Sequence, residues 1–321
     1  MEIIVNKYNI PVIYLDTFVI IDLVRSIYGK DKEKVIWGNS VIGEINRLTS
    51  NKKAIFPEAD QYSEIDAGKR LIPETQKLLL QISKGIQFKD YITIEDIQTK
   101  RLMKAYVQKE KEILFEPEDS FIKNPYDLIN NKNHYLIGIY TSNSENEINE
   151  KKERIKNIKN KETFEERLTT EKMYHFDKIE DIHEKMYKNK KATKEDEIEI
   201  KQFIFKPFEW FIEYSDNLKI TDIKEQIIEL KKFFASEYFF NIPFIDIRLQ
   251  LTSDLMMGNE IISTGDYQDI HEISAIMPYA QYMIVDKRMT YRIKKLNLDK
   301  KYNTKLIKFS KDFLPFLISI K

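Results

Sequence analysis

The stretch PVIYLDTFVIIDL, residues 11–23, decides the fold of this chain. Its first part, 11–15, is short, apolar and partly β-branched, and this pattern predicts a buried strand. The strand ends on Asp16, and an amphipathic pattern that predicts a helix runs from Thr17 to about Gly29. A carboxylate at the end of a buried strand needs a partner, because burying an uncompensated charge is unfavourable.

The same arrangement recurs near the far end of the chain. YMIVD, residues 282–286, predicts a strand that ends on Asp286, and a helix is predicted over 287–296. Two further short strands are predicted, at 52–59 and 304–310. Strands therefore alternate with helices at both ends of the chain. This alternation favours an α/β fold, with a parallel central sheet flanked by helices.

The middle of the chain has a different character. From about residue 95 to 240 it is rich in Lys, Glu, Ile and Asn and nearly lacks glycine. Mixed charges of this kind predict solvated helices, so we expect a mostly α-helical insertion between two halves of one domain. The halves are 1–94 and 241–321, and the insertion is 95–240. Residues 85–94 are expected to be extended, and further helices are expected over 32–50, 72–85, 206–240, 242–258 and 267–277.

Composition excludes several kinds of chemistry. The chain has no cysteine, which excludes disulfides, zinc–thiolate sites and thiol catalysis. Neither a glycine-rich phosphate loop nor a Walker motif is present. The 52 basic and 52 acidic side chains cancel, so net charge indicates no partner, although local patches can still bind nucleic acid. No apolar run approaches the roughly 18–20 residues of a membrane span, and no signal peptide is found. We therefore expect a soluble cytoplasmic protein without a membrane partner.

Several acids follow the predicted strands. In open α/β sheets, sites form beyond the carboxyl ends of the strands, where Asp16 and Asp286 fall. If the two strands are parallel neighbours, these carboxylates converge. Asp266 and Asp269 lie one turn apart at the start of a predicted helix, after a capping pattern in STGD. Glu64 lies at the start of the helix that is predicted after the second strand.

Clustered carboxylates repel one another, and this raises the pKa of some of them. A hard divalent cation such as Mg²⁺ or Mn²⁺ removes the conflict, because it prefers oxygen ligands. Such ions activate water and stabilise the leaving oxygen in phosphodiester hydrolysis. The acids therefore favour metal-dependent hydrolysis of a nucleic-acid backbone. The alternative is that Asp16 and Asp286 only cap the helices that follow them.

Three blocks of the sequence resemble PIN-domain nucleases. YLDTFVIIDL resembles the opening strand, acid and helix of that family, and AIFPEADQYSEIDAGKRL resembles its middle block. GDYQDIHEISAIMPYAQYMIVDKRM resembles the closing block of a prokaryotic PIN-like subgroup. The three blocks occur in the family's order and span about 10–90 and 240–310. The resemblance implies a PIN-like parallel sheet, one or two Mg²⁺ or Mn²⁺ ions, and hydrolysis of RNA or DNA.

The resemblance also assigns residues by position. Asp16, Glu64, Asp269 and Asp286 would be the catalytic acids and metal ligands, and Asp266 would be an accessory ligand or a helix cap. Small PIN-like proteins often act as toxins or phage-defence effectors, so such a role is implied too. The helical insertion could mediate a homodimer or bind a partner protein.

Further residues are candidates for the substrate site. Thr17 and His271 lie next to or near the acids, and Lys287 and Arg288 could contact phosphate. Glu44 is the alternative to Glu64 as the second acid. The aromatic run FFASEYFF, which ends at residue 240, is expected in the core rather than as a base-stacking surface.

Three positions depart from the family pattern: Phe18, Val285 and Gln281. Two other functions therefore stay open. One is a 5′/flap-type nuclease that acts on branched DNA. The other is a catalytically silent PIN-like module that binds nucleic acid or a protein. Cleavage of branched and linear substrates and titration with Mn²⁺ separate these functions.

Overall fold

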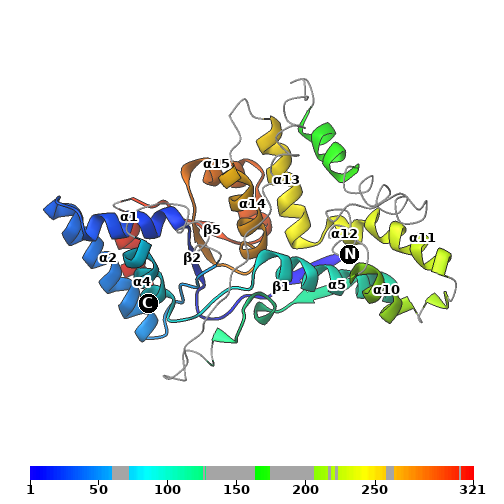
Figure 1. Cartoon of the computed structure of the whole chain (residues 1–321), viewed down its shortest axis with the longest axis horizontal. Helices are drawn as coiled ribbons and strands as arrows, with labels where there is room; N and C mark the ends of the chain where they lie inside the picture. The colour runs from blue at the N-terminus through cyan, green and yellow to red at the C-terminus, as the bar shows by residue number, and fades with distance from the viewer. Residues whose placement is uncertain are drawn as a thin grey trace. The chain divides into compact units, whose positions relative to one another are not determined.

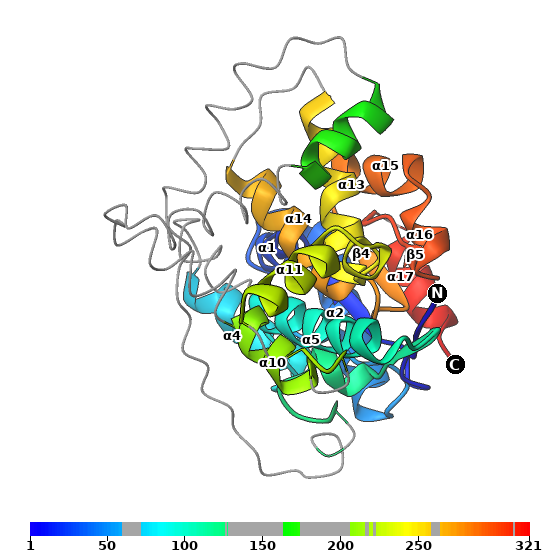
Figure 2. The ribbon, with the colours of Figure 1, turned by 90° about the vertical axis from the view of Figure 1, so that its right-hand side faces the viewer.

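The structure is a computed structural model of the chain (Figures 1 and 2). It describes residues 1–59, 72–125, 127, 163–173, 206–215, 218–220, 223–257, 264–310 and 312–321. The described residues form a mixed α/β fold with short parallel strands, as predicted. No helix among these residues is both long enough and apolar enough to cross a membrane.

The chain divides into two compact units. The sheet unit comprises Val5–Tyr91, Ala275–Lys321 and the described residues of Glu116–Glu150. The helical unit comprises Met1–Ile4, Ile92–Phe115 and the described residues of Lys151–Ser274. The chain passes between the two units after Tyr91, after Phe115 and after Ser274. The predicted halves, 1–94 and 241–321, and the predicted insertion, 95–240, stay predictions.

Helices make up most of the helical unit. It holds most of α5 (Tyr91–Gln108) and of α14 (Thr264–Ile276), and a small sheet pairs β1 (Glu2–Val5) with β3 (Glu112–Phe115). Residues 164–173 are also helical. The aromatic run is core, as expected, since Phe233, Phe234 and Phe239 are buried. The remaining helices are α10 (Lys206–Ser215), α11 (Ile223–Phe234), α12 (Glu237–Phe240) and α13 (Pro243–Met257).

The sheet unit contains strands within the predicted ranges 11–15, 282–286 and 304–310, whereas the predicted strand at 52–59 makes only isolated bridges. Its strands are β2 (Ile13–Leu15), β4 (Tyr282–Ile284) and β5 (Lys305–Leu306). A 3₁₀ helix, η1 (Pro117–Ser120), also belongs to it. Its α-helices are α1 (Thr17–Ile27), α2 (Lys32–Ser50), α4 (Ile72–Ser83), α15 (Lys287–Lys295), α16 (Leu298–Lys301) and α17 (Phe313–Ser319).

The parallel sheet extends beyond its regular strands. β2 pairs in parallel with β4, and β4 pairs in parallel with β5. On the other side of β2, a parallel bridge joins Val12 to Ile55, and a second parallel bridge joins Glu58, three residues after Ile55, to Gln87. These bridges add two extended segments, the Ile55 segment and the Gln87 segment. With these two segments, the order across the sheet is the Gln87 segment, the Ile55 segment, β2, β4 and β5.

This strand order creates a switch point between β2 and β4. The chain leaves β2 through α1 and α2 and returns to the sheet on one side, in the Ile55 segment. It leaves β4 through α15 and α16 and returns on the other side, in β5. Open α/β sheets bind ligands in the crevice where neighbouring crossovers diverge in this way, beyond the carboxyl ends of the strands.

The main core of the sheet unit lies on one face of the sheet. Alternate residues of a strand point to the same face, and Ile13 and Leu15 of β2 and Ile284 of β4 face this core. Residues of α1, α2 and α4 complete it. The apolar stretch near the C-terminus contributes too, because it forms α17 and buries Phe313 and Leu317 there.

One predicted element differs from the structure. The sequence predicts an extended segment over 85–94, but only Gln87 and Phe88 make strand bridges, and α5 begins at Tyr91. The β-branched residues at 92–94 favour a strand by composition. The buried residues of α5, among them Ile94, Gln98 and Leu102, recur at helical spacing, and this packing pattern decides the element.

Polar contacts of Lys7 join the amino ends of the strands. The Lys7 ammonium donates to Ala280 O at 2.6 Å, to Asn303 O at 2.9 Å and to Thr304 Oγ1 at 3.0 Å. Thr304 is buried, and its hydroxyl also lies 2.8 Å from Met277 O. Lys7 therefore attaches the segment before β2 to the turns that precede β4 and β5.

Thr304→Val is expected to lower the free energy of unfolding by about 1–3 kcal/mol. Valine keeps the shape of threonine but removes both the donor to Met277 O and one acceptor of Lys7. Urea denaturation measures the loss. Thr49→Val is the matched control, because the buried Thr49 hydroxyl donates to Ile45 O in its own helix, at 2.9 Å. That bond adds little to a helix, so equal losses in the two variants would contradict the prediction.

Candidate functional site

Asp16 and Asp286 follow two adjacent strands of the parallel sheet. Leu15 of β2 pairs in register with Ile284 of β4, and the Asp16 N–H donates to Ile284 O at 3.0 Å. The two strands are therefore parallel neighbours, as predicted. Both acids lie at the edge of the sheet where the parallel strands end, which we call the carboxyl edge. They flank the switch point between β2 and β4.

The two carboxylates differ in how they relate to the helices that follow. Asp286 caps α15, because its Oδ1 accepts from Met289 N at 2.9 Å. Asp16 occupies the corresponding position before α1, but its side chain makes no capping bond to that helix. Helix capping thus accounts for only one of the two carboxylate oxygens of Asp286. Capping by the side chain does not account for the aspartate at position 16.

Thr17 adds a polar group beside Asp16. The residue is buried, with 5% of its surface exposed, and its Oγ1 has no hydrogen-bond partner among the described residues. A buried hydroxyl without a partner is unfavourable by about 1–3 kcal/mol, so it marks a place where a water or a ligand would be stabilised. Carboxylate and hydroxyl oxygens are the donors that Mg²⁺ and Mn²⁺ prefer, so this donor set fits such an ion.

Glu64, the predicted second acid, lies outside the described residues. Its alternative, Glu44, forms an ion pair with Arg47 one turn later in α2, at 2.6 Å. The hydrogen bond between them raises the pKa of Arg47. Asp22, the second acid of the opening stretch, pairs with Arg25 at 3.3 Å on the exposed side of α1.

Three further predicted site residues, Asp266, Asp269 and His271, lie on α14, in the helical unit. Asp266 is buried and Asp269 is half-buried, and they lie one turn apart as predicted. His271 is half-buried, and its ring centroid lies 6.1 Å from that of Phe244. Within the described residues, no three acidic or histidine side chains come close enough together to hold a metal ion.

The three departures from the PIN pattern have different environments. Gln281 lies at the amino ends of the strands, where it accepts from Val12 N at 2.8 Å and donates to Tyr8 O at 2.5 Å. It is therefore a structural residue at the edge opposite Asp286. Phe18 packs edge-on against Phe309 at 5.9 Å, and Val285 is buried. Phe18 lies two residues after Asp16, and Val285 directly precedes Asp286.

A further acid, Glu58, also lies at the end of an extended segment and is not among the predicted site residues. Glu58 ends the Ile55 segment and is 4% exposed. Burial raises its pKa to about 7, although a hydrogen bond from Ser83 at 3.4 Å acts in the opposite direction. Glu58 lies two residues after Phe56, which packs in this core, so the Glu58 side chain points to the same face of the sheet. There it contacts Ser83 of α4. The signal was present in the sequence, because Glu58 ends an apolar strand as Asp16 does.

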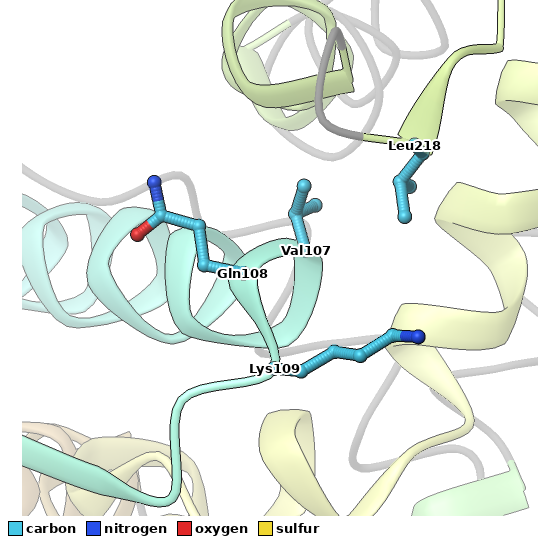
Figure 3. Close-up of a pocket in the computed structure, with 4 residues that line it drawn as sticks. All are labelled: Val107, Gln108, Lys109 and Leu218. Atoms are coloured by element: carbon cyan, nitrogen blue, oxygen red, sulfur yellow. The ribbon is translucent and has the colours of Figure 1, made fainter.

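Lys287 and Arg288, the predicted phosphate contacts, are exposed at the start of α15. A separate hollow lies in the helical unit, lined by Val107, Gln108, Lys109 and Leu218 (Figure 3). This lining offers an amide and an ammonium but no carboxylate, so it does not resemble a hydrolytic site.

Comparisons with known proteins add no assignment. No family model matches the chain, and neither the curated proteins nor the solved structures contain a significant match. The link to PIN-domain nucleases is therefore a resemblance that rests on three blocks of sequence.

Proposed function

We propose that the chain is a metal-dependent nuclease of the PIN-like type, which hydrolyses phosphodiester bonds in RNA or DNA. One observation carries the proposal. Asp16 and Asp286 end neighbouring parallel strands on the two sides of a switch point, where α/β sheets place their ligands. Exposed Lys287 and Arg288 follow Asp286 directly, and cations at this place suit a phosphate-bearing substrate.

The proposed metal ligands are Asp16 and Asp286, together with Glu64 and Asp269 by resemblance, and with Asp266 as an accessory ligand or a helix cap. A bound Mg²⁺ or Mn²⁺ would lower the pKa of a water molecule and stabilise charge on the leaving oxygen. The capping bond from Met289 N restricts the Asp286 carboxylate and uses one of its two oxygens. Thr17 and His271 are the proposed polar contacts to substrate.

The test is cleavage of single-stranded RNA, single-stranded DNA and branched DNA with Mn²⁺, with Mg²⁺ and with EDTA. We expect hydrolysis with either metal and none with EDTA, and calorimetry should show Mn²⁺ binding at or below millimolar concentration. Cutting confined to branched DNA would favour the flap-type nuclease. Absence of both cutting and Mn²⁺ binding would favour the catalytically silent module.

The resemblance also supports a role as a toxin or phage-defence effector. Growth arrest on expression that depends on Asp16 would support this role, and arrest by the Asp16→Asn variant would count against it. We also propose that the helical unit mediates contact with a second copy or a partner protein. Sedimentation of the purified chain tests the homodimer.

A further inference from the structure

One segment of this neutral chain is strongly basic. Residues 287–311 contain ten lysines and arginines but a single acid, Asp299. Because the 52 basic and 52 acidic residues cancel over the whole chain, this excess is local. Local cationic surfaces, rather than net charge, set the binding of polyanions.

The charge is concentrated on one side of α15. Helical positions separated by three or four residues share a face, and the exposed residues of α15 follow this spacing. The opposite side is packed into the protein, since Met289, Arg292 and Ile293 are buried. We call the exposed side the cationic face of α15, and it consists of Lys287, Arg288, Tyr291, Lys294 and Lys295.

Tyr291 is the unusual member of this face. It is 67% exposed, the second most exposed of the large hydrophobic residues described, and it lies at the centre of the helix between the two pairs of cations. An exposed ring among cations offers a flat apolar surface and phosphate-binding groups together. Single-stranded nucleic acids are recognised by this combination, because their unpaired bases can stack on aromatic rings.

Neighbouring elements extend the basic character. α15 packs against α16, and α16 packs against β5, as Figure 2 shows. These two elements and their flanks carry exposed Lys300, Lys301 and Lys305. Lys301 lies over the Tyr302 ring at 5.6 Å. The only acid of the segment, Asp299, is half-buried and so offsets little of the exposed charge.

We propose that the cationic face of α15 binds single-stranded nucleic acid, with Tyr291 stacked on a base and the lysines and arginine on the phosphates. The inference rests on the proposed nuclease function and names its substrate class. α15 begins directly after Asp286, so a strand bound along this helix leads to the carboxyl edge of the sheet. Duplex nucleic acid fits less well, because its base faces are covered by stacking.

Fluorescence anisotropy with short labelled oligo(U) and oligo(dT) tests the proposal, in EDTA so that no hydrolysis occurs. Tyr291→Ala is expected to weaken binding about ten-fold, the loss of one base stack. The double variant Lys287→Gln/Lys294→Gln is expected to bind with a weaker dependence on salt. The slope of the logarithm of the binding constant against the logarithm of the salt concentration should be shallower by about 0.7 for each lysine–phosphate contact that is lost. Comparison of the two oligonucleotides shows whether the strand is RNA or DNA.

Matched controls come from the first two helices. Tyr28, just after α1, is 61% exposed, so Tyr28→Ala removes a comparable ring. Lys32→Gln/Lys34→Gln removes two exposed cations from the start of α2. Both controls should bind within about two-fold of wild type. Because all the altered side chains are exposed, urea denaturation should show unchanged stability in every variant.

Wild-type binding by the α15 variants would overturn the proposal, and so would binding to phosphatidylserine vesicles without binding to oligonucleotides. The outcome is separable from nuclease activity. If the chain cleaves no nucleic acid but the α15 variants bind oligonucleotides more weakly than wild type, the result supports binding by the cationic face and counts against the nuclease function. If the chain cleaves nucleic acid but the α15 variants bind as tightly as wild type, the proposal for the cationic face is rejected and the nuclease function is kept.

Discussion

Asp16→Asn is expected to reduce hydrolysis of nucleic acid at least about 100-fold while leaving the fold intact. Asparagine keeps the shape of aspartate but loses the negative charge that a divalent cation requires. Changes in the groups that merely orient metal ligands cost about 10–100-fold, so removal of a ligand itself should cost at least as much. The Asp16 side chain does not cap α1, so the helix should not be weakened by the change.

Asp22→Asn is the matched control, because it makes the same change of charge six residues later in the same strand–helix stretch. Asp22 pairs with the exposed Arg25, and surface pairs of this kind contribute little to stability. We expect wild-type cleavage from this variant. Initial rates on single-stranded RNA and DNA with Mn²⁺ measure both effects, and urea denaturation checks the fold. Equal residual cutting by wild type and Asp16→Asn would exclude Asp16 from catalysis.

Stability should depend on pH through Glu58. Burial raises the pKa of this residue to about 7 in the folded protein, above its ordinary value of 4.5. The folded state therefore binds the proton more tightly, and this stabilisation is complete below pH 4.5 and lost as pH rises through 7. A shift of this size corresponds to a fall of up to about 3 kcal/mol in the free energy of unfolding.

Urea denaturation at pH 5 and at pH 8 measures this fall. Glu58→Gln keeps the shape and stays neutral, so it should be more stable than wild type at pH 8 and should show a flatter pH dependence. Glu33→Gln, at an exposed glutamate in the first turn of α2, should keep the wild-type pH dependence. A pH dependence in Glu58→Gln as steep as in wild type would place the titrating group elsewhere.

Much of the sheet unit could be predicted because its elements carry local signals. Alternation and periodicity locate β2, α1 and β4, and a glycine marks the end of α4, where Gly85 has a φ of +77°. The order of the strands has no such signal. It depends on the side of the sheet to which each crossover returns.

Parts of the candidate site carry local signals as well. An acid after an apolar strand identifies Asp16 and Asp286, and helical spacing places Asp266 and Asp269 one turn apart. The same pattern does not distinguish Glu58, which also ends an extended segment but faces the core. A change of one residue in strand register reverses the face on which a side chain lies, and sequence alone does not show that register.

The pairing of β2 with β4 has a consequence during protein synthesis. Val12, beside β2, bonds Gln281, beside β4, and 269 residues separate them in the chain. At about 5–20 residues per second, a ribosome needs on the order of tens of seconds to make that interval. During this time the apolar β2 has its early partner, the Ile55 segment, but one open edge. The nascent chain therefore carries an unpaired apolar strand edge throughout that interval, and such edges promote aggregation.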